Sequence, residues 1–508
     1  MTKKTLILVG FIIVKFLLQY SLINSEYDLQ RDEYLHLDQA NHLAWGYLSV
    51  PPVTSWISTI IKWLGNSVFW IKFFPALFGA LTIIFIWKTI EELKGNLFAL
   101  ILGATCILFS VILRINTLYQ PNSLDILFWT TFYFFVIKYF KTEKPKWIYG
   151  GAIVFAFGLL NKYNIGFLLT GLFPAILLTQ QRSLFIKQSF YVAAFIGLLL
   201  IAPHLLWQYN NGFPVVHHLK ELADTQLVNV DRFDFLKNQL LFFTGSLLVI
   251  VAALYALVFY KPFQKYQSFF WAFFFTLLVF IYFKAKDYYA IGLYPVYISF
   301  GSVFMAHLLK EGWKKYLQPL MIAIPILFFI PFYNIGFPNK SPEYIIQHAK
   351  RYKDFGLLRW EDGKDHSLPQ DFADMLGWKE LAIKVDSICS KLPNLDQTLI
   401  LCDNYGQAGA INYYKTHKKI VASSFNADYV NWLRYDKKII DVVLIKEADD
   451  EDKNRKTEIP FFDTVYLAGK RINRFAREEE ISIYVLRGAK IDVNKRIQDE
   501  ADKKKNYR

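Results

Sequence analysis

The chain opens with an apolar run, LILVGFIIVKFLLQYSLI at residues 6–23, and a polar stretch, NSEYDLQRDEY at residues 24–34, follows it directly. As a helix rising about 1.5 Å per residue, the apolar run is long enough to cross a hydrocarbon core about 30 Å thick. Two adjacent carboxylates, Asp32 and Glu33, therefore arrive at a membrane surface. This placement makes the polar stretch the first candidate for a functional site.

The apolar pattern recurs along the chain. Its 508 residues are 54% hydrophobic and 18% aromatic, with a mean hydropathy of +0.24, which is too apolar for a soluble protein and too interrupted for a single anchor. We expect an α-helical polytopic membrane protein with about 11 transmembrane helices, because that many stretches approach the length of a span. They lie at 6–23, 68–90, 97–113, 124–140, 147–160, 165–179, 190–207, 240–260, 269–283, 288–309 and 317–333. Residues 1–333 form this transmembrane domain.

Lys and Arg in the connecting loops predict the orientation. The loops on the same side as Lys3 and Lys4 carry a large excess of Lys and Arg, and the loops on the other side do not. Cytoplasmic loops retain positive charge, so the long loop 24–66 is expected on the outer face of the cytoplasmic (inner) membrane. The multi-pass topology also makes the region after Tyr333 extracytoplasmic. The net charge of +14 then reflects topology and requires no nucleic acid partner.

The composition changes after residue 333. Residues 334–494 alternate helical and strand patterns and predict a soluble α/β domain. Helical spacing occurs at 378–392 and 406–414, and strand patterns occur at 398–402, 439–446, 464–467 and 481–486. Residues 495–508 are polar and charged, which predicts a mobile tail.

Ionisable side chains gather near the outer ends of the expected spans, where they usually have a partner or a task. Four cations could hold a phosphate, with a cation reaching to the lipid headgroups as the alternative for the first two: Arg114, Lys162, Lys284 and Lys286. Asp125 begins a span and either caps that helix or orients a cation. Carboxylates beside such cations suit an enzyme that uses a lipid-phosphate substrate, through acid–base or metal chemistry.

His36, Asp38 and His42 follow the two carboxylates closely. Their spacing does not place all three on one helical face, so we interpret them as a polar loop face. A divalent metal ion held by His36 and His42 is the alternative, and no other cofactor is indicated. No P-loop or GxGxxG motif occurs, which disfavours a nucleotide-driven pump.

Several blocks together resemble a known family. They are Arg31-Asp32-Glu33-Tyr34, Trp45-Gly46-Tyr47 with Pro51-Pro52, Gln120-Pro121-Asn122-Ser123-Leu124-Asp125, Asn161-Lys162-Tyr163-Asn164, Lys284-Ala285-Lys286-Asp287-Tyr288-Tyr289 and Asp403-Asn404-Tyr405-Gly406. In order and sidedness they resemble the bacterial membrane glycosyltransferases of the GT-C type, relatives of the dolichyl-phosphate-mannose protein mannosyltransferases and of the lipid A aminoarabinose transferase.

The resemblance implies an inverting glycosyltransferase. Such an enzyme moves a sugar from a polyprenyl-phosphate-linked donor to an exported acceptor, which is a lipid, a glycan or a protein, at the outer face of the membrane. The resemblance assigns the catalytic base to Asp32, with Glu33 as an assistant, and the four cations are the candidates for binding the donor phosphate. Supporting roles are expected for Asp125, Tyr163, Asp287 and Tyr288.

The chain departs from the aminoarabinose branch at one position. The aminoarabinose branch has Lys-Pro-Pro where this chain has Val50-Pro51-Pro52, so either Lys284 or Lys286 contributes more to phosphate binding or the donor differs. A non-catalytic transporter or flippase of lipid-linked sugars is the alternative function. Such a protein would show an internal repeat and paired charges inside its spans, and neither is evident in the sequence.

Overall fold

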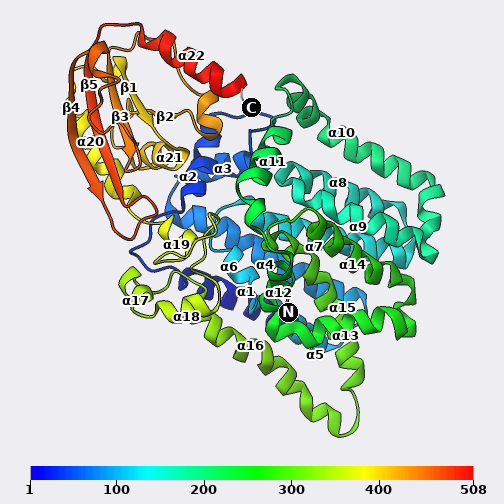
Figure 1. Ribbon diagram of the computed structural model, residues 1–508. Coiled ribbons are helices and arrows are strands. Elements are labelled where there is room, and N and C mark those ends of the chain that lie inside the picture. The colour runs from blue at the N-terminus through cyan, green and yellow to red at the C-terminus, as the bar shows by residue number, and fades with distance from the viewer. Residues whose placement is uncertain (1, 507–508) are drawn as a thin grey trace.

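A body of apolar helices and a mixed α/β domain make up the computed structural model, which describes residues 2–506 (Figure 1). The short helices α2 (Arg31–Asp38) and α3 (Val53–Trp63) lie between the two parts. The polar stretch that follows the first apolar run therefore sits where the helical body meets the C-terminal domain.

Every stretch expected to span the membrane is helical. The helices of the body are α1 (Lys3–Tyr20), α4 (Val68–Glu92), α5 (Leu97–Leu108), α6 (Ile112–Ile115), α7 (Pro121–Thr142), α8 (Pro145–Asn161), α9 (Gly166–Leu177), α10 (Gln188–Asn210), α13 (Leu247–Phe259), α14 (Gln267–Tyr282), α15 (Tyr294–Leu308) and α16 (Gln318–Ile335). Within the described residues, six helical segments are long and apolar enough to cross a membrane, or eight if two bent pairs each form one span. The polytopic fold is confirmed, and the count of about 11 spans stays a prediction.

Shorter helices complete the helical body and the segment that follows it. They are α11 (Pro214–Thr225), α12 (Arg232–Phe242), α17 (Pro342–Gln347), α18 (Ala349–Asp354) and α19 (Gln370–Ala373). The segment that carries α17 to α19 leads from the last long helix into the C-terminal domain. It packs around Tyr27 in a small core with Ile345, Leu368 and Phe372.

The C-terminal domain is built on a five-stranded sheet in the order β2-β1-β3-β5-β4. Its strands are β1 (Thr398–Cys402), β2 (Ala422–Ser424), β3 (Asp441–Glu447), β4 (Phe462–Ile472) and β5 (Glu480–Ala489). The first three are parallel to one another, and β5 and β4 add antiparallel. Helices α20 (Trp378–Cys389) and α21 (Tyr405–Tyr414) pack on one face. The predicted α/β domain is confirmed.

The prediction of a mobile tail from residue 495 is wrong. Residues Val493–Asn506 form the helix α22. Val493, Ile497 and Ala501 recur every four residues, which places them on one helical face, and all three are buried against the sheet face opposite α20 and α21. A short apolar stripe in a highly charged segment is sufficient to dock this helix.

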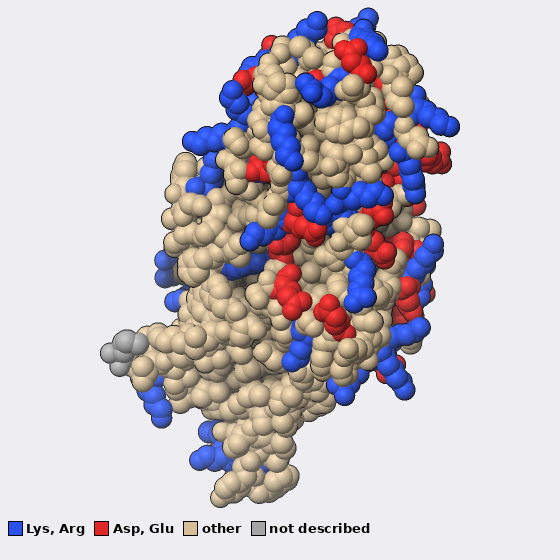
Figure 2. Space-filling view, turned by 90° about the vertical axis from the view of Figure 1, so that its left-hand side faces the viewer, with Lys and Arg blue, Asp and Glu red and all other residues tan. Residues whose placement is uncertain are grey.

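Charge is distributed unevenly over the surface. Figure 2 shows Lys, Arg, Asp and Glu side chains crowded over the upper part of one face, where the C-terminal domain lies. The lower part of that face is largely uncharged. Long apolar helices with this kind of surface are those of a multi-pass membrane protein.

Candidate active site

The candidate site begins with the N-terminus of α2. Gln30 caps this helix, because its side-chain oxygen accepts a hydrogen bond from the Asp32 amide at 2.8 Å. The Glu33 carboxylate completes a capping box, because it accepts a hydrogen bond from the backbone amide of Gln30 at 2.7 Å. Carboxylates in a first helical turn are favoured by the positive end of the helix dipole. The sequence therefore holds Asp32 and Glu33 in a rigid turn.

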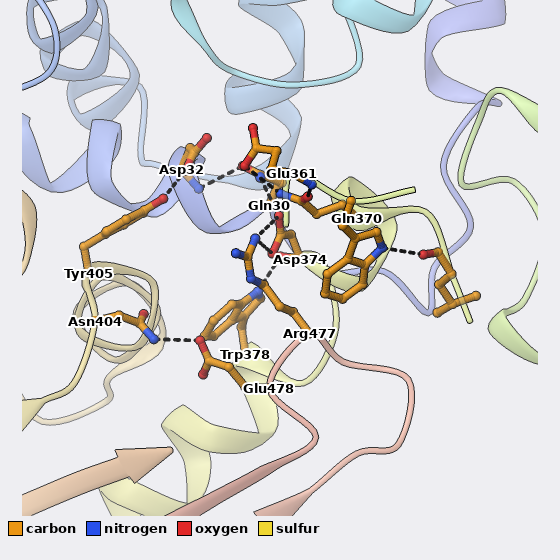
Figure 3. Close-up of polar contacts among 12 residues, drawn as sticks. Gln30, Asp32, Glu361, Gln370, Asp374, Trp378, Asn404, Tyr405, Arg477 and Glu478 are labelled. Carbon is orange, nitrogen blue, oxygen red and sulfur yellow. Dashed lines mark hydrogen bonds and ion pairs between the residues drawn. The ribbon is translucent and has the colours of Figure 1, made fainter. Parts of the chain in front are cut away.

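Asp32 is held at both carboxylate oxygens. The Tyr405 hydroxyl donates to Oδ1 at 2.6 Å (Figure 3). The side-chain amide of Gln120 donates to Oδ2 at 3.0 Å. The two donors come from the C-terminal domain and from the N-terminus of α7. Asp32 is nevertheless partly exposed. Each carboxylate oxygen has two acceptor positions, so an incoming hydroxyl can still hydrogen bond here.

Glu33 occupies a different environment. It is 0% exposed, and the Lys72 ammonium lies 2.6 Å from Oε1 and 2.8 Å from Oε2. The backbone amide of Tyr119 also donates to Oε1 at 2.7 Å. This carboxylate is thus neutralised inside the protein. Its assignment as a catalytic assistant stays a prediction, and its geometry favours a structural role.

A hydrogen-bonded chain leads from Asp32 to Lys162. Gln120, which contacts Asp32, accepts from the Asn122 amide at 2.9 Å, and Asn122 in turn accepts from the Lys162 ammonium at 2.5 Å. The Lys162 ammonium also lies 4.1 Å from the ring centre of Tyr289. Four sequence blocks that are far apart in the chain therefore meet in one place.

The other supporting candidates surround this chain. Asp125 is buried and accepts from the Asn164 amide at 2.9 Å, and the same amide donates to the Tyr289 carbonyl at 2.8 Å. Asp287 accepts from the Tyr288 backbone amide at 2.7 Å and from an asparagine of α12, and the Tyr288 ring lies 5.2 Å from the Lys162 ammonium. These contacts brace the Lys162 region.

Tyr163 joins α10 to the first long loop. Its hydroxyl lies 2.9 Å from Nε2 of His204, and Nδ1 of His204 lies 2.6 Å from the Trp45 carbonyl oxygen. Gln208 also donates to the Tyr163 hydroxyl at 2.8 Å. Tyr163 therefore connects α10 with the loop at Trp45 and does not contact Asp32.

The remaining predicted cations differ in how they are paired. Arg114 donates to both oxygens of Asp371 at 3.0 and 2.8 Å, and Lys286 forms an ion pair with Glu361 at 2.5 Å. Lys284 has a left-handed backbone with φ of 50° and forms no ion pair with the described residues. Of the four cations, Lys162 is the one joined to Asp32.

The histidines lie in separate packing environments. Nδ1 of His36 is 3.4 Å from the Gln39 side-chain oxygen, and burial lowers the pKa of this imidazole. His42 stacks on Trp432 with 4.3 Å between ring centres. Across residues 2–506 there is no group of three or more His, Cys, Asp or Glu side chains that could hold a metal ion.

A second polar network extends from the site into the C-terminal domain (Figure 3). Arg477 contacts the buried Asp374 at 3.2 Å, and burial raises the pKa of Asp374 to about 6 although Arg31 and Arg477 oppose this shift. The Asn404 amide lies 2.6 Å from carboxylate oxygens of both Glu447 and Glu478. A cavity of about 350 Å³ opens beside these groups, lined in part by Trp360, Phe475, Arg477, Glu447 and Glu478.

Part of this geometry lies in a region with a family match. Residues 49–207 match the family model described as dolichyl-phosphate-mannose-protein mannosyltransferase. This match includes the blocks that contain Gln120, Asn122 and Lys162. No curated protein matches the chain by sequence.

Solved structures match over nearly the whole chain. The structure of ArnT from Cupriavidus metallidurans bound to undecaprenyl phosphate has a TM-score of 0.61 at 11% identity, covering 95% of this chain and 98% of that one. The apo structure of the same ArnT has a TM-score of 0.58 at 11% identity, with the same coverage. The protein has the GT-C fold. It is a multi-pass membrane protein of this type, with the C-terminal sheet domain included in the match.

Three side chains of this candidate site have no role that the sequence pattern indicates: Gln120, Asn122 and Tyr405. Gln120 and Asn122 lie in the block 120–125 that resembles the family, but their side chains are not ionisable, unlike that of their neighbour Asp125. Tyr405 lies in a sequence with glycines at 406 and 409, on one helical face. That spacing indicates a close helix contact and is the signal that points to Tyr405.

Proposed function

We propose that this GT-C protein is a glycosyltransferase that moves a sugar from a polyprenyl-phosphate-linked donor to an exported acceptor at the outer face of the membrane. The observation that carries the proposal is the hydrogen-bonded chain from Asp32 to Lys162. It places a partly exposed carboxylate and a cation at the two ends of one rigid network. A base and a phosphate-binding group at such positions are what sugar transfer from a lipid phosphate requires.

In the proposed reaction, an acceptor hydroxyl attacks the anomeric carbon of the donor sugar. The new bond joins the acceptor oxygen to that carbon, and the bond from the carbon to the phosphate oxygen breaks. The electron pair of the broken bond leaves with the polyprenyl phosphate, and the hydroxyl proton passes to the Asp32 carboxylate. Attack opposite the leaving group inverts the configuration at the anomeric carbon.

Lys162 is proposed to stabilise the negative charge that develops on the leaving phosphate. Its hydrogen-bond partner is the neutral Asn122 side chain, and the Asp125 carboxylate acts on its charge without forming a direct ion pair in the described part of the chain. Arg114 and Lys286, in contrast, are already paired with carboxylates. A phosphate competes more easily for a cation that no carboxylate contacts directly. Lys284 is the second candidate for this role.

The test is turnover by the purified full-length protein in proteoliposomes, with a panel of polyprenyl-phosphate sugars and exported acceptors. Asp32→Asn is expected to lower kcat by about 10²- to 10⁴-fold, the usual contribution of a general base. Lys162→Met is expected to lower kcat/KM by roughly 10- to 100-fold, because a charge-assisted contact to the phosphate is lost.

The matched control is Glu26→Gln, which removes an exposed carboxylate of the same loop and should leave turnover unchanged. Full activity of Asp32→Asn at wild-type expression would refute the assignment of the base. Movement of lipid-linked sugar across the bilayer, without any transfer by the wild-type protein, would support the flippase alternative instead.

A further inference from the structure

The C-terminal domain contacts α2 through the first turns of α21. Two glycines on one face of α21 make this contact close: a β-carbon at Gly406 would lie 3.2 Å from the β-carbon of Arg31, and one at Gly409 would lie 2.7 Å from that of Tyr34. Side chains at these positions would hold the helices apart. The small residues therefore bring the start of α21 within reach of the candidate base.

Tyr405 uses this proximity to reach Asp32. It is the first residue of α21, after the cap Asn404, and its hydroxyl lies 2.6 Å from Oδ1 (Figure 3). This is a short hydrogen bond to a carboxylate, and such bonds are stronger than those between neutral groups. Gln120 holds the other oxygen. Without Tyr405, one side of the carboxylate would lose its donor.

Arg31 fixes the tyrosine ring in turn. Its guanidinium carbon lies 4.5 Å from the ring centre of Tyr405. A cation over an aromatic face is an attractive arrangement. Burial and the nearby Asp32 carboxylate hold the pKa of the Tyr405 phenol well above its usual range, so the phenol remains a hydrogen-bond donor at working pH.

We propose that Tyr405 is a positioning residue for Asp32, which makes docking of the C-terminal domain a requirement for a complete active site. The inference rests on the proposed role of Asp32 as the base. Tyr405 contributes by orienting the carboxylate and stabilising its charged form. A donor to the charged form lowers the pKa of a carboxyl group, and removal of that donor raises it.

Several other charged or titratable groups act on Asp32, from α2, from the segment before α20 and from the turn before α15. They are Arg31, His36, Asp374 and Tyr288. These groups stay in place when the hydroxyl of Tyr405 alone is removed. A change in the pH dependence of the rate then reports on that hydroxyl.

The experiment measures kcat/KM against pH for the full-length protein and for Tyr405→Phe. Removal of the hydroxyl should move the acid limb of the profile to higher pH by about one unit, as expected for the loss of one hydrogen bond to a charged carboxylate. The loss of rate is then larger at low pH than at high pH, and any loss that remains at high pH reports on the orientation of the carboxylate. A pH-independent loss, or no loss, would overturn the inference.

The chain offers a matched control at the same interface. The hydroxyl of Tyr429 lies 2.7 Å from Oδ2 of Asp38, so Tyr429→Phe removes a second tyrosine–aspartate contact between the C-terminal domain and α2. Its acid limb should coincide with that of the wild-type protein. An equal shift in Tyr429→Phe would mean that the interface, and not the contact to Asp32, causes the effect.

A second variant covers the case in which Tyr405→Phe does not fold. Site-specific 3-fluorotyrosine at position 405 keeps the ring and hydroxyl and makes the phenol a stronger donor. It should move the acid limb to lower pH, opposite to the phenylalanine variant, and an unchanged limb would contradict the inference. Loss of turnover in Asp32→Asn with no shift in either Tyr405 variant would refute this inference and leave the proposed function standing.

Discussion

The neighbouring carboxylates of Asp32 and Glu33 lie in different environments. Asp32 is partly exposed and hydrogen bonded by Tyr405 and Gln120, whereas Glu33 is completely buried against Lys72. The difference follows from helix geometry, since successive residues of α2 point about 100° apart. One carboxylate is available for chemistry, and the other holds the loop to α4.

The buried pair predicts a stability effect that is separate from catalysis. Glu33→Gln should destabilise the protein by about 3–5 kcal/mol, because Lys72 would be left buried without a counter-charge. Thermal unfolding of the purified protein in detergent measures this loss. The double variant Glu33→Gln with Lys72→Met should recover much of it. If Glu33→Gln alone unfolded at the same temperature as the wild-type protein, the structural role of Glu33 would be contradicted.

Glu447 predicts a pH dependence in the C-terminal domain. Burial, and then the charge of Glu478, raises the pKa of Glu447 from 4.5 to about 7. The folded state keeps a proton that the unfolded state releases, so this contribution to stability is complete below pH 4.5 and is lost as pH rises through about 7. The unfolding temperature should therefore fall over this range.

The variant that checks this prediction is Glu447→Gln, whose neutral side chain should remove that part of the pH dependence. The exposed Glu451→Gln serves as the control and should follow the wild-type curve. A slope between pH 4.5 and 7 that is the same in all three proteins would exclude Glu447 as its source.

At the scale of elements, the contact between α2 and α21 depends on the absence of side chains. Gly409 lies against Tyr34, and Gly406 lies against Arg31. Helices of ordinary composition pack 8–10 Å apart, and small residues permit a closer approach. The position of Tyr405 therefore depends on how closely α2 and α21 pack.

Gly409→Ala tests this packing. The added methyl group would lie 2.7 Å from the β-carbon of Tyr34, so the helices must separate, at an expected cost of about 1–3 kcal/mol. Chemical or thermal unfolding measures the cost. Gly10→Ala is the matched control in α1, where an added β-carbon meets no atom within 4 Å. Equal stability of both variants would argue against tight packing at α21.

The sequence predicts the helices and strands better than it predicts which distant side chains contact one another. Apolar length and strand alternation are local signals, and they located the helices of the body and, for example, β1 at residues 398–402. The sequence pattern does not indicate the helix α22, because only Val493, Ile497 and Ala501 interrupt a charged segment. The pairing of Arg114 with Asp371 could not be predicted, since 257 positions separate them and no local pattern encodes the contact.

At the scale of the whole molecule, the C-terminal domain and the segment that leads into it are tied to the helical body in several places. Arg114 binds Asp371, Lys286 binds Glu361, and Asp28 accepts from the backbone amide of Trp378 at the start of α20. These contacts anchor the domain at the end of the body that holds Asp32. The two parts are expected to work as one unit.

The proposed topology places the C-terminal domain outside and the turn between α15 and α16 inside. Single cysteines at the exposed positions Lys438 and Lys314 should then react differently with a membrane-impermeant maleimide. We expect labelling at 438 in intact spheroplasts, and labelling at 314 only after lysis. The native cysteines are buried, which keeps the background low. The reverse pattern would invert the topology and contradict the outer-face site.

The hydrogen bond between Asp32 and Tyr405 joins residues 373 positions apart. At a synthesis rate of about 5–20 residues per second, the ribosome adds Tyr405 roughly 20–75 s after Asp32. During that interval the first loop also lacks Asn412 and Tyr429, the partners of Asp38. On the proposed role of Tyr405, a nascent chain already inserted in the bilayer is expected to be inactive until the last part of the polypeptide has been made and has folded back on the first.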